Sequence, residues 1–182
     1  LGNAAHYDRD GCQDMTYEMW FRPTSSSTQG WLMMKNAANG IKFLGMTQSI
    51  QTYAEAWCTH SKSDWVASTW YHIAMVNSAC THQLYVDGSL DGTCSNGASS
   101  TLNLDLHIGG GYSPLLSDAD LAEVRYWGVA RSAAEINANM RTSIVGADYD
   151  QSTLLGYWRF GDSADLAQDS SLWGADGEYP PS

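Results

Sequence analysis

Apolar and polar residues alternate with a period of two through most of the chain. In YEMWFRP (17–23), Tyr17, Met19 and Phe21 share one face of an extended segment, which Pro23 ends. Similar runs, bounded by glycine or polar residues, occupy residues 31–35, 41–46, 51–57, 70–76, 83–86, 102–108, 123–127 and 154–160. Short strands at such regular spacing predict an all-β fold, an antiparallel two-sheet sandwich.

One helix is predicted late in the chain. Ser132 and Glu135 have the spacing of a capping box, in which the two residues satisfy free backbone donors of the first turn. An apolar stripe follows at every fourth position, made by Ile136, Met140 and Ile144. We expect the helix to stop near Gly146.

The segment 70–93 predicts a hairpin. Asp87-Gly88 lies between two strand patterns, and this dipeptide favours the two-residue turns of antiparallel hairpins. Because Asp91-Gly92 follows almost at once, we expect a second tight turn there.

The four cysteines are interpreted as two disulfides formed in an oxidising compartment; they are Cys12, Cys58, Cys80 and Cys94. Their even number, the lack of a CxxC pair and the lack of a histidine at ligand spacing argue against zinc. Four cysteines allow three pairings, which the sequence alone does not distinguish. The expected hairpin brings Cys94 back beside Cys80, and this favours Cys80–Cys94 with Cys12–Cys58 as structural cross-links.

The charge balance excludes several classes of partner. The net charge is −11 and no basic stripe occurs, so nucleic acid and anionic lipid are repelled. No apolar run approaches the ~20 residues of a membrane span. Only 16% of residues are charged, and this low share, with abundant small polar residues, is typical of secreted β domains. We expect an extracellular or cell-surface location, and since the chain opens on Leu1, a larger multidomain protein or assembly around it.

The usual catalytic patterns are missing from the sequence. Glycosidases need paired carboxylates roughly 5 to 10 Å apart. Glu18, Glu55 and Glu123 stand alone, and no Glu-x-Asp-x-x-Glu pattern occurs. Neither Gly-x-Ser-x-Gly nor a phosphate-binding glycine-rich loop is found. We therefore expect the protein not to be an enzyme.

Aromatic residues near strand ends and loops are the candidate ligand-binding groups. Exposed rings stack on sugar faces, so Trp31, Trp57 and Tyr112 are expected glycan contacts, together with His60. Ordinary packing of the same rings is the competing interpretation. His72 lies inside a strand pattern and is expected in the core.

Several motifs resemble the laminin-G-like and pentraxin-like branch of the concanavalin A-like lectin/glucanase superfamily. They are YEMWFRP (17–23), WYHIAMV (70–76), LYVDG (84–88), LHIGG (106–110), LAEVRYWGVARSAAEI (121–136) and LLGYWRF (154–160). The resemblance implies a jelly-roll sandwich of two antiparallel sheets. Residues 156–182 resemble a segment that in many relatives precedes the first strand. Here they are expected either to complete this sandwich or to begin a tandem copy.

The resemblance also implies a calcium site built from loop oxygens. The long acidic loop of pentraxins is missing after LHIGG, so the double calcium site of that branch is not expected. The site of laminin-G-like relatives would use Asp8, Asp10, Asp162 and Asp169. Turn-forming aspartates in an acidic chain are the alternative interpretation.

These observations predict a non-catalytic extracellular module for binding or adhesion, with carbohydrate as its ligand. Ca²⁺ is the only expected cofactor, and a glycan or an extracellular protein is the expected partner. The alternative is a structural module of an extracellular filament, coat or cell-surface assembly that makes protein contacts.

Overall fold

The computed structural model describes residues 5–9, 12–35, 39–45, 47–96, 105–111, 114–144, 150, 152–161 and 168–171. The elements in chain order are η1 (Ala5–Tyr7), β1 (Met15–Pro23), β2 (Gly30–Lys35), β3 (Asn39–Leu44), β4 (Ser49–Ala54), β5 (Trp57–Thr59), β6 (Tyr71–Ser78), β7 (Thr81–Val86), β8 (Ser89–Ser95), β9 (Leu106–Ile108), β10 (Ala119–Trp127), α1 (Ala133–Asn139) and β11 (Leu154–Trp158).

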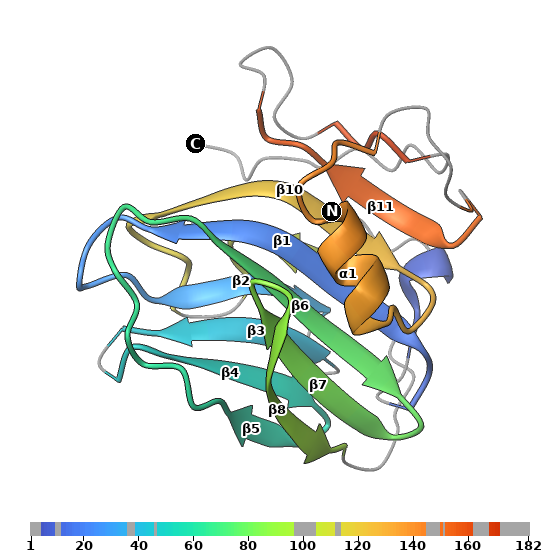
Figure 1. The fold of residues 1–182 in the computed structure, drawn as a ribbon, viewed down its shortest axis with the longest axis horizontal. Helices are drawn as coiled ribbons and strands as arrows, with labels where there is room; N and C mark the ends of the chain where they lie inside the picture. The colour runs from blue at the N-terminus through green and yellow to red at the C-terminus, as the bar shows by residue number, and fades with distance from the viewer. Residues whose placement is uncertain are drawn as a thin grey trace.

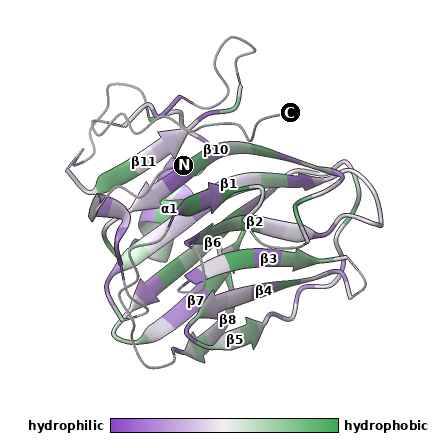
Figure 2. Ribbon diagram, turned by 180° about the vertical axis from the view of Figure 1, so that it is seen from behind, coloured by the Kyte–Doolittle hydropathy of each residue, from purple (hydrophilic) through white to green (hydrophobic). Residues whose placement is uncertain are grey.

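Two antiparallel sheets lie face to face, as the strand pattern predicts (Figure 1). One is six-stranded in the order β11-β10-β1-β6-β7-β8, and the other is five-stranded in the order β5-β4-β3-β2-β9. Seen from behind, the five-stranded sheet faces the viewer (Figure 2). The predicted sandwich is confirmed, and its jelly-roll architecture agrees with the resemblance.

The core lies between the sheets and follows the period of two. Tyr17, Met19 and Phe21 are fully buried in one cluster, as their shared face predicts. Ile41 and Phe43 reach the same cluster from the five-stranded sheet. Alternate side chains on each strand therefore point away from the core, and these outward positions decide what each sheet can bind.

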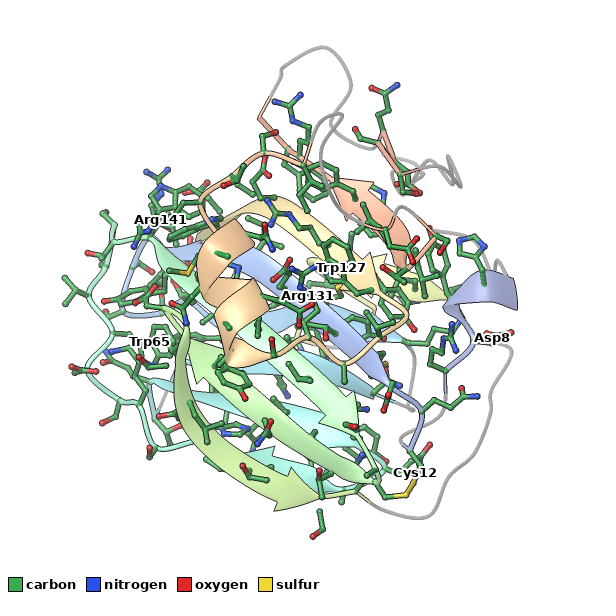
Figure 3. The ribbon with its side chains drawn as sticks, turned by 45° about the vertical axis from the view of Figure 1, so that its right-hand side comes forward. Asp8, Cys12, Trp65, Trp127, Arg131 and Arg141 are labelled. Carbon is green, nitrogen blue, oxygen red and sulfur yellow. A yellow bond between two sulfur atoms is a disulfide. The ribbon has the colours of Figure 1, made fainter. Side chains whose placement is uncertain are left out.

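Helix α1 covers the outer face of the six-stranded sheet (Figure 1). The capping box of Ser132 and Glu135 is present as predicted. Ile136 packs against Ala74 and Val76 of β6. On the same side of the sheet, the guanidinium of Arg131 lies 4.0 Å from the centre of the Trp127 ring (Figure 3).

The helix ends at Asn139 and is therefore shorter than the apolar stripe predicts. Side chains of the six-stranded sheet donate hydrogen bonds to the backbone carbonyls at and after this helix end. Arg125 donates to the Asn139 and Thr142 carbonyl oxygens at 3.1 and 2.7 Å. The Trp20 indole donates to the Met140 carbonyl oxygen at 2.7 Å. These bonds satisfy the helix end without further turns, and the expected stop at Gly146 lies outside the described residues.

The β7–β8 hairpin has the predicted turn at Asp87-Gly88. Val86 pairs with Ser89, and the two turn residues have φ of 49° and 75°, as a type I′ turn requires. The prediction of a second tight turn is wrong. Asp91-Gly92 lies inside β8, where the register with β7 shifts and the extra residue is accommodated as a bulge.

The expected cysteine pairing is also wrong, because the disulfides are Cys12–Cys80 and Cys58–Cys94. Cys94 lies opposite His82 in the β7–β8 register and not opposite Cys80. That face points into the sandwich, where Cys58 of β5 meets it. Since β5 and β8 are the edge strands of the two sheets, this disulfide closes the sandwich at that edge. Cys80 lies in the β6–β7 turn and joins Cys12, which precedes β1 (Figure 3).

The described part of the C-terminal segment lies on this sandwich. Strand β11 pairs with β10, and Trp158 is fully buried in the core. Beyond the strand, Asp169 forms a bridge with Trp158. Residues 154–161 and 168–171 therefore extend the six-stranded sheet at the edge opposite β8.

Candidate functional site

An aromatic cluster on the outer face of the five-stranded sheet is the candidate binding site. Residues 51–57 do not form the one strand expected, because the chain turns at Glu55, whose φ is 56°. Strand β5 then returns beside β4, and Trp57 pairs with Tyr53. Their ring centroids are 4.9 Å apart, and Trp31 of β2 lies 5.6 Å from Trp57. We call Trp31, Tyr53 and Trp57 the aromatic platform.

The platform presents one exposed ring on a supporting base. Trp57 is 54% exposed, whereas Trp31 is only 6% exposed and lies beneath its neighbours. Lys42 places its ammonium 5.5 Å from the centre of the Trp31 ring. The Gln51 amide donates to Thr59 Oγ1 at 3.0 Å on the same outer face. An exposed indole with neighbouring hydrogen-bonding groups can hold an apolar sugar face and the hydroxyls around it.

The structure brings together two of the four expected glycan contacts. Trp31 and Trp57 form the platform, but the His60 side chain is 1% exposed and points into the sandwich. The expectation for His60 is therefore not supported, since a buried imidazole cannot touch a glycan on the surface. Tyr112 lies outside the described residues.

Tyr53 of the platform and Lys42 beside it were not identified from the sequence. Both occupy outward positions between core residues of β4 and β3, so their orientation follows from the period of two. What the sequence did not signal is the turn that folds Trp57 back onto Tyr53. Without that turn, residues 51–57 are a single strand and the two rings are separated along it.

A depression of about 380 Å³ lies beside the end of α1, on the other sheet. Its lining residues are Trp20, Glu123, Met140, Arg141, Thr142 and Ser143. The Arg141 guanidinium lies 5.6 Å from the centre of the Trp20 ring, and Arg125 pairs with the Glu123 carboxylate at 2.8 Å. The Trp20 ring and the Glu123 carboxylate already have partners within the protein. This depression is therefore a weaker candidate for ligand binding than the platform.

Two of the four expected calcium ligands, Asp8 and Asp169, lie within the described residues. Asp8 forms an ion pair with Lys35 at 2.7 Å (Figure 3 labels Asp8). Asp169 is 5% exposed and accepts hydrogen bonds from the backbone N–H groups of Tyr157 and Ser171 at 2.8 and 2.9 Å. Both carboxylates thus serve protein groups, which fits a structural role better than calcium coordination. Asp10 and Asp162 lie outside the described residues, so the calcium site stays a prediction.

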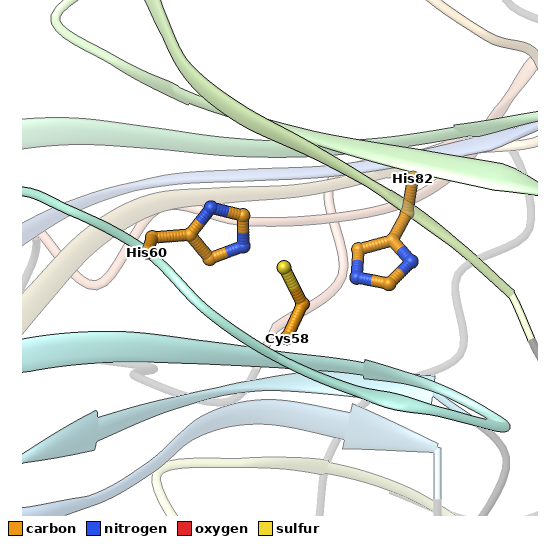
Figure 4. Close-up of side chains that lie close together, drawn as sticks. All are labelled: Cys58, His60 and His82. Carbon is orange, nitrogen blue, oxygen red and sulfur yellow. The ribbon is translucent and has the colours of Figure 1, made fainter.

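Behind the platform, a group of buried polar side chains lies between the sheets. The sulfur of Cys58 and ring nitrogens of His60 and His82 lie within 4.8 Å of one another (Figure 4). Burial lowers the pKa of His60 to about 4 and also lowers the pKa of His82, so both imidazoles are neutral at pH 7. The sequence argument that no histidine accompanies the cysteines is corrected by this arrangement.

Two of the glutamates that stand alone in the sequence, Glu18 and Glu123, are engaged by one arginine. Glu18 is fully buried beneath α1 and forms an ion pair with Arg125 at 3.4 Å. Glu123 is held by the same guanidinium and hydrogen-bonds the Tyr157 hydroxyl. His72, 1% exposed, is buried as predicted, with its Nε2 3.8 Å from Glu18. These groups stabilise the packing of α1 on the sheet.

Comparison with known protein families agrees with the fold. The laminin G model described as "Concanavalin A-like lectin/glucanases superfamily" matches residues 4–137. No protein with a curated function matches this sequence. In the part of the chain that the structure describes, no helix has the length and apolar character of a membrane span.

Solved structures with the same fold include proteins that handle carbohydrate. One from Bacteroides ovatus, assigned provisionally as a carbohydrate binding protein, superposes with a TM-score of 0.71 at 18% identity, over 89% of this chain and 50% of its own. The heptameric SAP-like pentraxin of Limulus polyphemus gives 0.55 at 14% identity, over 69% of each chain. Domain 4 of an extracellular arabinanase from Geobacillus stearothermophilus, solved with arabinotriose, gives 0.51 at 13% identity, over 72% of this chain and 74% of its own.

The present chain spans about half the length of the Bacteroides ovatus protein. At these identities the superpositions show a common fold and nothing about shared residues. The family model covers most of the chain, and its fold is the sandwich described above. The chain belongs to the concanavalin A-like lectin/glucanase superfamily.

Proposed function

We propose that the protein is an extracellular, non-catalytic module that binds carbohydrate through the aromatic platform. The observation that carries the proposal is the exposed Trp57 ring, seated on Tyr53 and Trp31 at the outer face of the five-stranded sheet. Covering this indole with the apolar face of a ligand is favourable, because it removes apolar surface from water.

The chemistry of the platform favours a neutral sugar chain. The C–H face of a pyranose or furanose ring packs on an indole, and the ring hydroxyls need donors and acceptors at its edge. Gln51, Thr59 and Lys42 lie on the outer face of the same sheet and supply these groups. The platform lies on an open sheet face, which suits a chain passing across it better than a sugar enclosed on all sides.

Three further observations support the proposal. Two disulfides are in keeping with an oxidising, extracellular setting. Structural neighbours with the same fold include a provisional carbohydrate binding protein and a domain solved with arabinotriose. The glutamates Glu18 and Glu123 are engaged by Arg125, and this supports binding without catalysis.

The test is binding to a panel of oligosaccharides, measured by calorimetry and tryptophan fluorescence. The panel contains arabinotriose and neutral oligomers of glucose, galactose and xylose. We expect at least one to bind, and Trp57→Ala to weaken it by about 2 kcal/mol, or roughly thirty-fold. Trp70→Ala is the matched control, because Trp70 is 38% exposed, lies outside the platform and packs on Arg22.

Equal losses of affinity in the two variants would show that the platform is not the binding site. Failure of every oligosaccharide to bind, with sedimentation showing a defined oligomer that Trp57→Ala dissociates, would favour the structural module, whose protein contacts would then use the same rings.

A further inference from the structure

The buried cluster behind the platform has the composition of a metal site. Cys58 Sγ, His60 and His82 contribute ligand atoms that lie within 4.8 Å of one another. In Figure 4 the two imidazoles flank the sulfur, and each turns a ring nitrogen toward it. Cys94, which is bonded to Cys58, lies opposite His82 in the β7–β8 register and brings a second sulfur to the same place.

His82 is oriented as a metal-binding histidine is. His82 Nδ1 lies 2.5 Å from the Asn96 side-chain oxygen, which can only accept, so Nδ1 carries the proton. Its Nε2 is then a bare acceptor, fully buried and without a hydrogen-bond partner. Such an orphaned buried atom needs an explanation. A second contact that fixes the tautomer of a histidine is the usual accompaniment of metal ligation.

The two ring nitrogens of His60 have different neighbours. One of its nitrogens, Nε2, lies 2.7 Å from the Thr52 hydroxyl, and Nδ1 has no hydrogen-bond partner. The Asp91 carboxylate lies 3.9 Å from Nδ1 and receives hydrogen bonds from the Ser61 backbone and hydroxyl at 3.0 and 2.9 Å. The carboxylate is therefore fixed beside Nδ1, which is the position of an outer partner when Nε2 is the metal ligand.

We propose that Cys58, Cys94, His60 and His82 form a Zn²⁺ site that opens when the Cys58–Cys94 disulfide is reduced. Two thiolates and two neutral imidazoles give a set that Zn²⁺ prefers in tetrahedral geometry. The complex has no net charge, and this limits the cost of burying the ion. Ligand atoms of such a site are roughly 3.3 to 3.8 Å apart. Side-chain movements of about 1 Å would therefore bring these atoms to metal-binding distances.

The chemistry balances with a dithiol as the reductant. The dithiol gives two electrons and two protons, the S–S bond breaks to two thiols, and the dithiol becomes a cyclic disulfide. Zn²⁺ binding then releases both thiol protons to solvent. In the oxidised protein the sulfurs are bonded to each other and are poor ligands. The site thus exchanges one cross-link between β5 and β8 for another.

The test uses the full chain and Co²⁺ as a spectroscopic probe. Protein kept reduced by a phosphine, which supplies no thiolate, is titrated with Co²⁺ and compared with the oxidised protein. We expect one ion per chain, with sulfur-to-cobalt charge transfer and strong tetrahedral bands in the reduced protein alone. Cys12→Ser/Cys80→Ser should keep the spectrum, because it removes the other disulfide, and His82→Ala should weaken Zn²⁺ binding more than about 100-fold.

Alkylation of the wild-type protein keeps the proposal testable if a variant does not fold. The reduced chain is treated with iodoacetamide with and without Zn²⁺, and modified cysteines are identified by mass spectrometry. We expect Zn²⁺ to protect Cys58 and Cys94 and to leave Cys12 and Cys80 reactive. Equal protection of all four cysteines, no protection, or cobalt binding without sulfur charge transfer would overturn the site.

Discussion

The Glu18 carboxylate and the Arg125 guanidinium form a buried ion pair between directly paired residues of β1 and β10, with Oε1 and Nη1 3.4 Å apart. The Trp127 indole donates to the same carboxylate oxygen at 2.8 Å. Arg125 also donates to the carbonyl oxygens of Asn139 and Thr142. One residue therefore neutralises a buried charge and fixes the end of α1.

Replacing Arg125 by Met should lower the free energy of unfolding by about 3 to 5 kcal/mol, because Glu18 remains buried without its partner. Urea denaturation checks the value. Arg22→Ala is the matched control, since the Arg22–Asp120 pair is 38% and 43% exposed and should contribute less than about 1 kcal/mol. Equal effects of the two variants would show that Glu18 does not depend on Arg125.

The Cys58–Cys94 disulfide should support both stability and binding. In the chain-entropy model, the sequence separation of 36 residues makes the loss from Cys58→Ala/Cys94→Ala about 4 kcal/mol. This variant should also weaken glycan binding in the fraction that remains folded, because Trp57 precedes Cys58 on a three-residue edge strand.

Cys12→Ala/Cys80→Ala is the control for this effect. The separation of 68 residues gives a similar loss of stability, of about 4 kcal/mol, but this disulfide does not touch β5. Calorimetric titration at a temperature where both variants are folded separates the two outcomes. If both bind glycan as the wild type does, the disulfide does not position the platform.

Stability should fall as the pH is lowered from neutrality. Burial lowers the pKa of His60 and of His72 to about 4, whereas the value in an unfolded chain is about 6.5. Between these values the unfolded chain binds protons that the folded chain does not, so the free energy of unfolding rises with pH. The contribution is complete above about pH 6.5 and is lost toward about pH 4.

Urea denaturation at about pH 7, 6 and 5 measures this slope. His72→Gln should reduce the slope, because it removes one of the titrating imidazoles while retaining a polar side chain. A free energy of unfolding that is constant between pH 7 and pH 5 would contradict the assignment of neutral, buried imidazoles.

Asp169 should act as a structural residue in the presence and absence of calcium. Its carboxylate accepts hydrogen bonds from the Tyr157 and Ser171 backbones and from the Ser171 hydroxyl. Asp169→Asn places a donor among these donors and should cost about 1 to 3 kcal/mol. We expect the substitution to lower the melting temperature by the same amount in Ca²⁺ and in chelator. A wild-type midpoint that rises with Ca²⁺, and a variant that does not respond, would instead support the calcium site.

Local sequence determined the sandwich and much of its detail. The period of two identified Tyr17, Met19 and Phe21 as core residues, because strand side chains alternate regardless of what the strand pairs with. The capping box of Ser132 and the turn at Asp87-Gly88 were correct for the same reason, since both depend on neighbours within a few residues.

Tertiary structure decided the pairings and the candidate sites. The disulfides follow from the face on which Cys94 lies and from the meeting of edge strands β5 and β8, neither of which is encoded locally. The platform needs the turn at Glu55 to bring Trp57 onto Tyr53. His60 follows β5 of one sheet, and His82 lies on β7 of the other. Contacts between residues distant in sequence depend on register and stacking, and these are settled only when the sheets pack.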